Sequence, residues 1–196
     1  MVKLDKIYTR GGDKGMTSLG NGARLAKQSL RVCAIGDVDE ANSSIGLARV
    51  AAENNSAPMT ITWSRLQNDL FDFGADIATP GDDPADGALR IQPSQVERLE
   101  QEIDAVNEAL DPLTSFVLPG GTELAARLHL ARTAARRAER SLMALADSEP
   151  VNAQALAYIN RLSDLLFVLA RQANDGGKKD VLWQPGMTAK GEKQRN

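Results

Sequence analysis

Three long stripes of apolar residues constrain the fold of this chain more than any other feature. Within each stripe the residues follow one another at steps of four or three, so they share one face of an α-helix. Many of them are alanine, a strong helix former that also lets neighbouring helices approach closely. The stripes consist of Leu30, Ala34, Val38, Ala41, Ile45, Ala48 and Ala52; of Leu124, Leu128, Ala131, Ala135, Ala138, Leu142 and Leu145; and of Ala155, Ile159, Leu162, Leu166, Leu169 and Ala173.

Two further helices are expected near residues 60–78 and 93–110. The second begins at Pro93, with Ser94 as a candidate N-cap and Glu97 three residues later, which is the spacing of a capping box. Turn-rich segments separate the expected helices. The sequence therefore predicts an all-α fold, with a single domain over residues 1–196. Its parts are a glycine-rich N-terminal loop (8–27), a bundle of five helices (about 28–175) and a polar C-terminal tail (176–196).

Composition and charge exclude several classes of protein. Aromatic residues make up only 4% of the 196 residues, which favours helices over sheet. The net charge of -3 gives no reason to expect a nucleic-acid partner. No apolar run approaches the roughly 20 residues that span a bilayer, and the N-terminus lacks the apolar segment of a signal peptide. We therefore expect a cytoplasmic protein without membrane contact.

The chain has one cysteine and one histidine, and both are expected to pack inside the bundle. Cys33 cannot form an intrachain disulfide, and its place in an apolar helical pattern predicts a small core residue. A single histidine excludes multi-histidine metal sites, including the Glu-x-x-His pairs of di-iron bundles. A serine hydrolase triad is also excluded, because the G-x-S-x-G elbow is absent. His129 is therefore expected to be a packing residue.

The segment YTRGGDKGMTSL, residues 8–19, differs from the helices in composition. Its glycines let backbone N–H groups turn toward an anion, and Arg10 and Lys14 add positive charge. Thr17 and Ser18 add donors that suit phosphate oxygens or magnesium-bound water. The segment is not a Walker P-loop, because G-x-x-x-x-G-K-[ST] is absent. Two interpretations follow from the residues, a phosphate cradle or a glycine-rich surface turn.

A row of arginines marks the fourth expected helix. Arg132, Arg136 and Arg140 are spaced by four residues and share one helix face, at the edge of the apolar stripe. Glu139 is placed to hold Arg136, whereas Arg137 points elsewhere. The row is either a solvated face crossed by salt bridges or an anion site. Three stacked like charges favour the second interpretation, since they repel one another unless an anion or an acidic partner neutralises them.

Two other helices carry a polar residue at the same edge position. Asp39 follows Val38 of the first stripe, and Asn160 follows Ile159 of the last. Asp39 could pair with an arginine of the row, within one subunit or across an interface, and Asn160 could contact a sugar or a base. Either could equally be structural. No residue resembles a covalent nucleophile, so these parts suit a site that binds a polyphosphate and positions it for attack by another group.

Five segments in order resemble the PduO-type ATP:cob(I)alamin adenosyltransferases, also called corrinoid adenosyltransferases. They are YTRGGDKGMTSL, GDVDEANSSIGLA, FVLPGG, ARTAARRAER and INRLSDLLFVLAR, and they run from residue 8 to about residue 171. The VLWQPG segment (181–186) also resembles the C-terminal W-x-P-G ending of that family. The resemblance implies a ferritin-like five-helix bundle that assembles as a homotrimer, with active sites between neighbouring subunits.

The resemblance also implies roles for individual residues. Arg132, Arg136, Asp39 and Phe116 would be catalytic. Asp39, Arg132 and Phe116 would bind the corrinoid, Phe116 on the lower face of the ring. Only Ala41 and Met16 depart from the pattern of the family. The implied ATP contacts are Thr9, Arg10, Gly11, Gly12, Asp13, Lys14, Gly15, Met16, Thr17, Ser18, Lys27, Arg136, Arg137, Ala138, Glu139, Arg140 and Asn160.

The implied reaction is transfer of the 5′-deoxyadenosyl group of ATP to cobalt(I) of a reduced corrinoid, with release of triphosphate. Mg²⁺ would come with the ATP phosphates, and no side chain is assigned to it. A reductase and an adenosylcobalamin-dependent enzyme are implied as partners. An alternative is a delivery or chaperone module that binds ATP and corrinoid without turnover. A structural bundle whose arginines form only salt bridges is a third reading.

Overall fold

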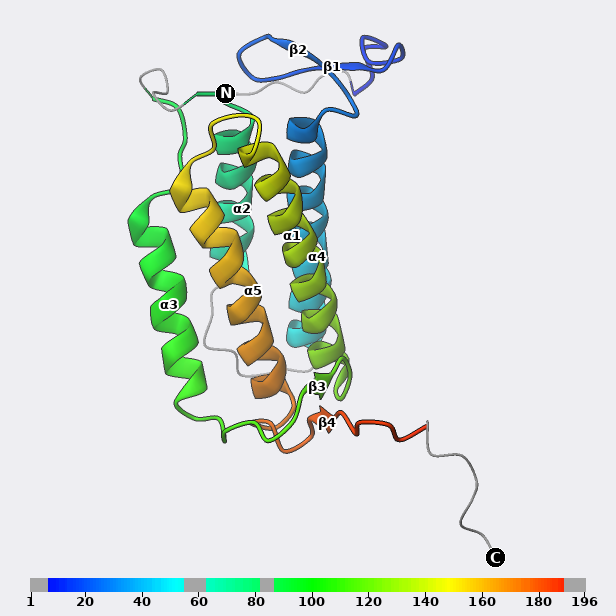
Figure 1. Ribbon diagram of the computed structural model, residues 1–196, viewed down its shortest axis with the longest axis vertical. Coiled ribbons are helices and arrows are strands. Elements are labelled where there is room, and N and C mark those ends of the chain that lie inside the picture. Colours follow the sequence, from blue (N-terminus) through cyan, green and yellow to red (C-terminus); the bar gives the residue numbers. More distant parts are fainter. Residues whose placement is uncertain (1–6, 55–62, 82–86, 189–196) are drawn as a thin grey trace, which may run out of the picture.

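The three apolar stripes form the buried faces of the three longest helices of the computed structural model (Figure 1). The structure describes residues 7–54, 63–81 and 87–188. The helices in these ranges are α1 (Leu30–Asn54), α2 (Trp63–Ile77), α3 (Pro93–Asn107), α4 (Glu123–Ala146) and α5 (Ala153–Ala173). The predicted all-α bundle is confirmed. The predicted beginning of the second helix at residue 60 lies outside the described residues.

Helix α4 lies between α1 and α5, while α2 packs on α1 and α3 packs on α5. Every stripe residue of α4 is buried. The stripes of α1 and α5 are buried except at their ends, where Leu30 is 46% exposed and Ala173 is partly exposed. Phe73 of α2 and Tyr158 of α5 meet across the core, with ring centroids 6.0 Å apart. One continuous apolar core therefore holds all five helices together.

Two local predictions are wrong. Cys33 is exposed, because it lies about 100° round α1 from the buried Ala34. Helix α3 has Gln92 as its N-cap in place of Ser94, and the Gln92 N–H donates to Gln95 Oε1 at 2.9 Å. Pro93 explains the shift, since a residue without an N–H and with a helical φ is suited to the first position of a helix.

Short antiparallel ribbons lie at the two ends of the bundle (Figure 1). Strands β1 (Met16–Ser18) and β2 (Arg24–Ala26) pair within the N-terminal loop. Strands β3 (Val117–Leu118) and β4 (Val181–Leu182) pair at the opposite end, with Val117 opposite Leu182. The second ribbon joins the segment before α4 to the segment after α5. No helix within the described ranges has the length and apolar character to cross a membrane.

Candidate functional site

The N-terminal loop turns its glycines toward a lysine. Gly15 has a φ of 78°, a conformation that L side chains rarely adopt, and its carbonyl accepts a hydrogen bond from Lys27 N–H at 2.9 Å. A Cβ placed on Gly12 would lie 3.1 Å from Lys27 Nζ, so the ammonium lies against the glycine backbone. Pairing of β1 with β2 thus brings Lys27 beside glycines that precede it by more than ten residues.

The remaining cations of the loop differ in what they contact. Arg24 donates to Gly11 O at 2.8 Å and to Ser18 Oγ at 3.1 Å, which closes the loop on itself. Arg10 has a φ of 59° and lies over the Tyr8 ring, 5.7 Å from its centroid. Lys14 is exposed. The loop therefore presents cations and glycine backbone to solvent, as a phosphate cradle requires, and anion binding here stays a prediction.

The arginine row lies along one side of α4, as its spacing predicts. Arg132 is partly buried, while Arg136 and Arg140 are exposed. Burial lowers the pKa of Arg132, and the nearby charge of Arg136 lowers it further. None of the three forms an ion pair with another residue in the described part of the chain. The row is therefore a concentration of positive charge without a close counter-ion there.

The predicted contact between Glu139 and Arg136 is not formed. Glu139 Oε1 instead accepts a hydrogen bond from Asn160 Nδ2 at 2.8 Å, across the seam between α4 and α5. Glu139 is nearer to the buried stripe than Arg136, so its carboxylate faces α5. Asp164 lies one turn beyond Asn160, and burial raises its pKa, with smaller effects from Arg161, Glu139 and Arg136. The α4–α5 seam therefore holds the glutamate–asparagine pair beside the arginine row.

Arg137 points away from the row, as its position in the helix predicts. It donates from Nε to Asp37 Oδ1 of α1 at 3.0 Å and also pairs with Glu40. These two carboxylates raise the pKa of Arg137, Glu40 more than Asp37. Ser141 bonds the other oxygen of Asp37. Within one chain, then, Arg137 joins α4 to α1, and its predicted contact with ATP is untested.

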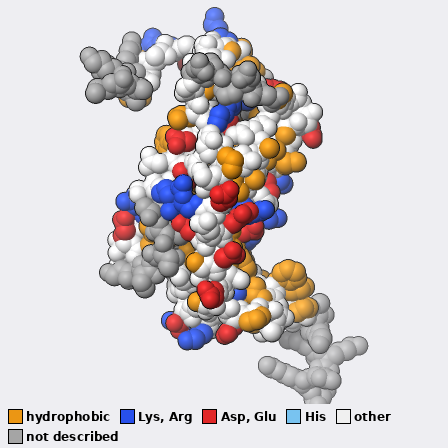
Figure 2. Space-filling model, turned by 90° about the vertical axis from the view of Figure 1, so that its left-hand side faces the viewer, with side chains coloured by type: hydrophobic (Ala, Val, Ile, Leu, Met, Phe, Trp, Pro, Cys, Tyr) orange, Lys and Arg blue, Asp and Glu red, His pale blue; other side chains and the backbone are white. Residues whose placement is uncertain are grey.

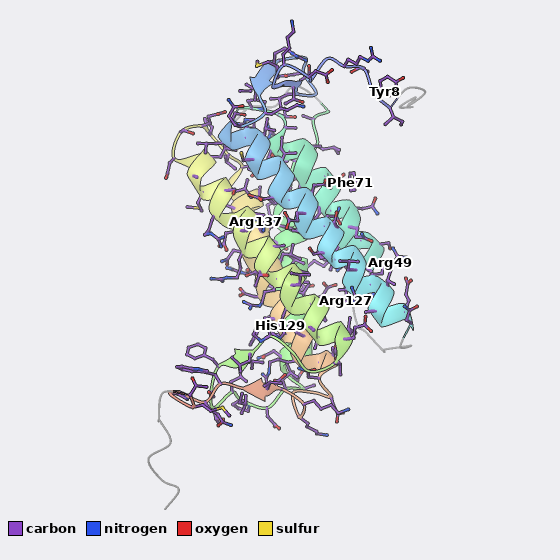
Figure 3. The ribbon with its side chains drawn as sticks, turned by 90° about the vertical axis from the view of Figure 1, so that its right-hand side faces the viewer. Tyr8, Arg49, Phe71, Arg127, His129 and Arg137 are labelled. Carbon is purple, nitrogen blue, oxygen red and sulfur yellow. The ribbon has the colours of Figure 1, made fainter. Side chains whose placement is uncertain are left out.

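Asp39 lies on the opposite side of α1 from Arg137. It is exposed and lines a groove of about 350 Å³ between α1 and α2, together with Leu70 and Phe71. The Phe71 side chain is 71% exposed on the outer side of α2 (Figure 3). Asp39 forms no ion pair among the residues that the structure describes. The alternative in which Asp39 pairs with an arginine of the row within one subunit is therefore not observed.

Phe116 lies just before β3, at the end of the bundle opposite the N-terminal loop. Its side chain is 77% exposed, and its ring packs on that of Trp183, with centroids 6.0 Å apart. Leu118, Val181, Leu182 and Met187 are also exposed in or beside this ribbon. Figure 2 shows hydrophobic side chains gathered at this end of the molecule. The ribbon thus carries an open apolar surface.

The buried side chain of Asn174 helps to hold the ribbon on the bundle. Asn174, 0% exposed, accepts from Thr122 N–H at 2.9 Å and donates to Gly120 O at 3.2 Å and to Asp180 Oδ1 at 3.0 Å. Gly121 has a φ of 97°, and a Cβ there would lie 2.2 Å from Asn174 Oδ1. Only glycine therefore allows this approach. Asn174 consequently ties the ends of α4 and α5 to both strands of the ribbon.

His129 is buried above the β3–β4 ribbon, near the beginning of α4 (Figure 3). It is 1% exposed, its ring lies 6.2 Å from that of Phe167, and neither ring nitrogen has a hydrogen-bond partner among the described residues. Burial lowers the pKa of His129, Arg132 lowers it further, and Asp180 opposes them. His129 is therefore a packed neutral imidazole, which agrees with the packing role predicted for it.

The predicted site residues do not all meet within one chain. The α4–α5 seam brings Arg136, Glu139 and Asn160 together. The N-terminal loop and the β3–β4 ribbon lie at opposite ends of the bundle (Figure 1), Phe116 directly precedes β3, and Asp39 faces α2. One chain therefore presents three separate surfaces: a loop, an arginine row with an apolar ribbon below it, and the Asp39 groove.

Two neighbours of these surfaces, Asp164 and Trp183, are not among the site residues predicted from the sequence. Asp164 follows Asn160 by four residues, so helical spacing alone places it on the same side of α5. That signal is available in the sequence. Trp183 lies 67 residues after Phe116, and only the pairing of β3 with β4 makes them neighbours. Nothing in the local sequence indicates that contact.

Comparison with known proteins connects this geometry to a family. The sequence model of the family described as cobalamin adenosyltransferase matches residues 7–173. A corrinoid adenosyltransferase of Mycobacterium leprae is 49% identical over 191 residues, which cover 94% of this chain and 98% of that protein. A cobalamin adenosyltransferase of Cupriavidus metallidurans is 46% identical over 183 residues, which cover 93% of this chain and 96% of that protein.

Solved structures show the same fold. A phenylalanine-to-histidine variant of the PduO-type ATP:corrinoid adenosyltransferase from Lactobacillus reuteri, complexed with cobalamin and ATP, is 38% identical and superposes with a TM-score of 0.80. The match covers 92% of this chain and 97% of that one. An arginine-to-lysine variant of the enzyme, complexed with ATP, is 39% identical with a TM-score of 0.80, over 91% and 100% of the two chains. This chain belongs to the cobalamin adenosyltransferase family.

Proposed function

We propose that this protein is an ATP:corrinoid adenosyltransferase, which transfers the 5′-deoxyadenosyl group of ATP to cobalt(I) of a reduced corrinoid. The observation that carries the proposal is the arginine row of α4. It has no close counter-ion in the described chain, and it lies beside the Glu139–Asn160 pair in a member of this family. A row of unneutralised guanidinium groups suits a triphosphate, and an amide and a carboxylate suit a nucleoside.

In the proposed reaction, the electron pair of cobalt(I) attacks the 5′ carbon of ATP. A cobalt–carbon bond forms while the bond from that carbon to the triphosphate oxygen breaks, and triphosphate leaves with the bonding electrons. The corrinoid is therefore the nucleophile, which explains why the chain needs no covalent nucleophile of its own. The protein contributes proximity, by holding the 5′ carbon over cobalt.

The basic side chains would stabilise the charge that grows on the leaving triphosphate. We assign this role to Arg136 and Arg140 of the row and to Lys14 and Lys27 of the N-terminal loop. Mg²⁺ would bind through the phosphates of ATP, since the described residues contain no cluster of three or more histidine, cysteine or acidic side chains suited to a metal. Arg137 would contribute only if ATP draws it from Asp37 and Glu40.

The corrinoid surface would combine Phe116, Arg132 and Asp39. Phe116 would lie against the lower face of the ring and exclude an axial ligand there, because an apolar wall cannot coordinate cobalt. A four-coordinate cobalt(II) is easier to reduce, and a reductase would supply the electron. Since Asp39 lies apart from Arg132 within one chain, we place the complete site between subunits of a homotrimer.

The first test is an anaerobic assay with chemically reduced cobalamin, ATP and Mg²⁺. We expect the cobalt(I) absorbance to decay while light-sensitive adenosylcobalamin forms, and we expect Arg136→Ala to slow formation of this product severely. An ATP-induced thermal shift without any product, in a folded protein, would instead support a delivery module that binds its ligands without turnover. The absence of both would leave a structural bundle.

A further inference from the structure

Trp183 and Phe116 are cross-strand neighbours. The register of Val117 opposite Leu182 places Phe116 opposite Trp183, one position before β3 and one after β4. Opposed residues of an antiparallel pair project from the same face of a ribbon. Their rings accordingly make contact, with centroids 6.0 Å apart and planes at 56°. This tilted geometry is favourable for aromatic pairs.

The backbone of Trp183 is fixed independently of its ring. Trp183 N–H donates to Phe116 O at 2.8 Å, and Ser115 Oγ donates to Trp183 O at 2.8 Å. Three residues earlier, Asp180 is held by Arg171 Nε at 2.9 Å and by Asn174 Nδ2 at 3.0 Å. A substitution of the indole would therefore leave the ribbon in place and remove only the ring contact.

Phe116 depends on that contact for its orientation. A side chain that is 77% exposed has few neighbours to restrict its rotamers, whereas Trp183, at 44%, is the more enclosed of the two. We propose that Trp183 is a positioning residue, which holds the Phe116 ring upright on the apolar surface where the lower face of the corrinoid is bound. This inference rests on the proposed function, because it assigns Trp183 a part in the exclusion of the lower axial ligand.

The consequence is specific to one form of the substrate. Without the indole, Phe116 is present but turns between rotamers, and a lower ligand reaches cobalt(II) more often. The four-coordinate fraction of bound cobalt(II) then falls, while ATP binding and the attack by preformed cobalt(I) are spared. A ring contact of this kind corresponds to about a two- to tenfold change in that fraction.

The experiment measures four-coordinate cob(II)alamin by electron paramagnetic resonance, with saturating ATP and full-length protein. Four variants are compared with the wild type: Trp183→Ala, Trp183→Phe, Phe116→Ala and Leu113→Ala. Leu113 is the matched control, an apolar side chain that is 41% exposed in the segment before the ribbon and has no part in the proposed corrinoid surface. We expect Phe116→Ala to lose the four-coordinate signal, Trp183→Ala to lower it two- to tenfold, and Trp183→Phe and Leu113→Ala to keep it.

Each other result overturns a defined part of the inference. A wild-type signal in Trp183→Ala, with the signal lost in Phe116→Ala, would remove the positioning role of Trp183 and leave the proposed function intact. A wild-type signal in Phe116→Ala would refute the role of Phe116 and the inference with it. An equal loss in Leu113→Ala would show that the signal responds to any apolar truncation near the ribbon and not to the ring contact, which also overturns the proposal.

Discussion

Among single residues, Arg136 carries the sharpest prediction. It lies in the middle of the row, is exposed, and has no ion pair in the described chain, so its charge is available to a ligand. We expect Arg136→Ala to lower kcat by about 10²–10³-fold, the effect of removing one donor that stabilises a leaving anion. Arg127→Ala on the same helix is the matched control, because Arg127 pairs with Glu123 of its own helix and with no other acidic residue of the described ranges. Steady-state kinetics with preformed cobalt(I) would measure kcat of both variants. Equal losses of kcat would refute the role of Arg136 in stabilising the leaving triphosphate.

His129 predicts how stability depends on pH. Burial, and then Arg132, lower its pKa below the unfolded value of 6.5, so the unfolded chain binds more protons just below neutrality. The free energy of unfolding should therefore fall as pH decreases from 7.5 to 5.5, by at most about 1.4 kcal/mol per pH unit. Urea titrations of the wild type and His129→Gln would measure this.

The comparison is clean because His129 is the only histidine of the chain. Burial raises the pKa of Asp164 above 3.8, which gives stability a pH dependence of the opposite sign. Both proteins contain Asp164, so its contribution cancels in the comparison. The difference in slope between wild type and His129→Gln should thus belong to the imidazole. Parallel curves over this window would contradict a lowered pKa for His129.

At the scale of elements, Asn174 should govern the attachment of the β3–β4 ribbon. Asn174→Ala leaves the partly buried groups Thr122 N–H and Gly120 O without their partner, at a cost of about 2–4 kcal/mol in unfolding free energy. Urea unfolding, followed by Trp183 fluorescence in a Trp63→Phe background, would show this loss. Asn68→Ala, an exposed asparagine of α2, should change stability by less than about 0.5 kcal/mol. Similar losses in both variants would count against the anchoring role.

The helices could be predicted from the sequence because periodicity is a local signal. The stripes on α1, α4 and α5 are buried as expected, and the edge positions of the arginines and Asn160 follow from the same arithmetic. The burial of single residues and the ends of helices are predicted less well. Cys33 is exposed although its neighbour Ala34 is buried, and α3 is capped by Gln92, two residues before the predicted Ser94. The two ribbons could not be predicted from the sequence, because strands of two or three residues form only by pairing with other segments of the chain.

For the molecule as a whole, the separation of the surfaces within one chain is the central observation. Asp39 faces α2, while the arginine row lies beside the α4–α5 seam, so a single chain cannot bring Asp39 beside Arg132 without a second copy. Exposed apolar residues on the outer sides of α1 and α4, among them Leu47, Val50 and Leu130, are suited to an interface between chains. For the proposed homotrimer, sedimentation should give about three times the mass of one chain.

A shared site also predicts rescue between two inactive variants. If Asp39 and Arg136 of one site come from different chains, then refolding Asp39→Ala together with Arg136→Ala should create some sites that carry neither lesion. In a closed ring assembled at random from equal amounts, about one interface in four joins two intact faces, so about a quarter of the wild-type activity should return. Arg132→Ala mixed with Arg136→Ala is the matched control. Both lesions lie on the same face of α4, and no rescue is expected. Activity in neither mixture, from assemblies of normal mass, would show that Asp39 and Arg136 of one site belong to the same chain.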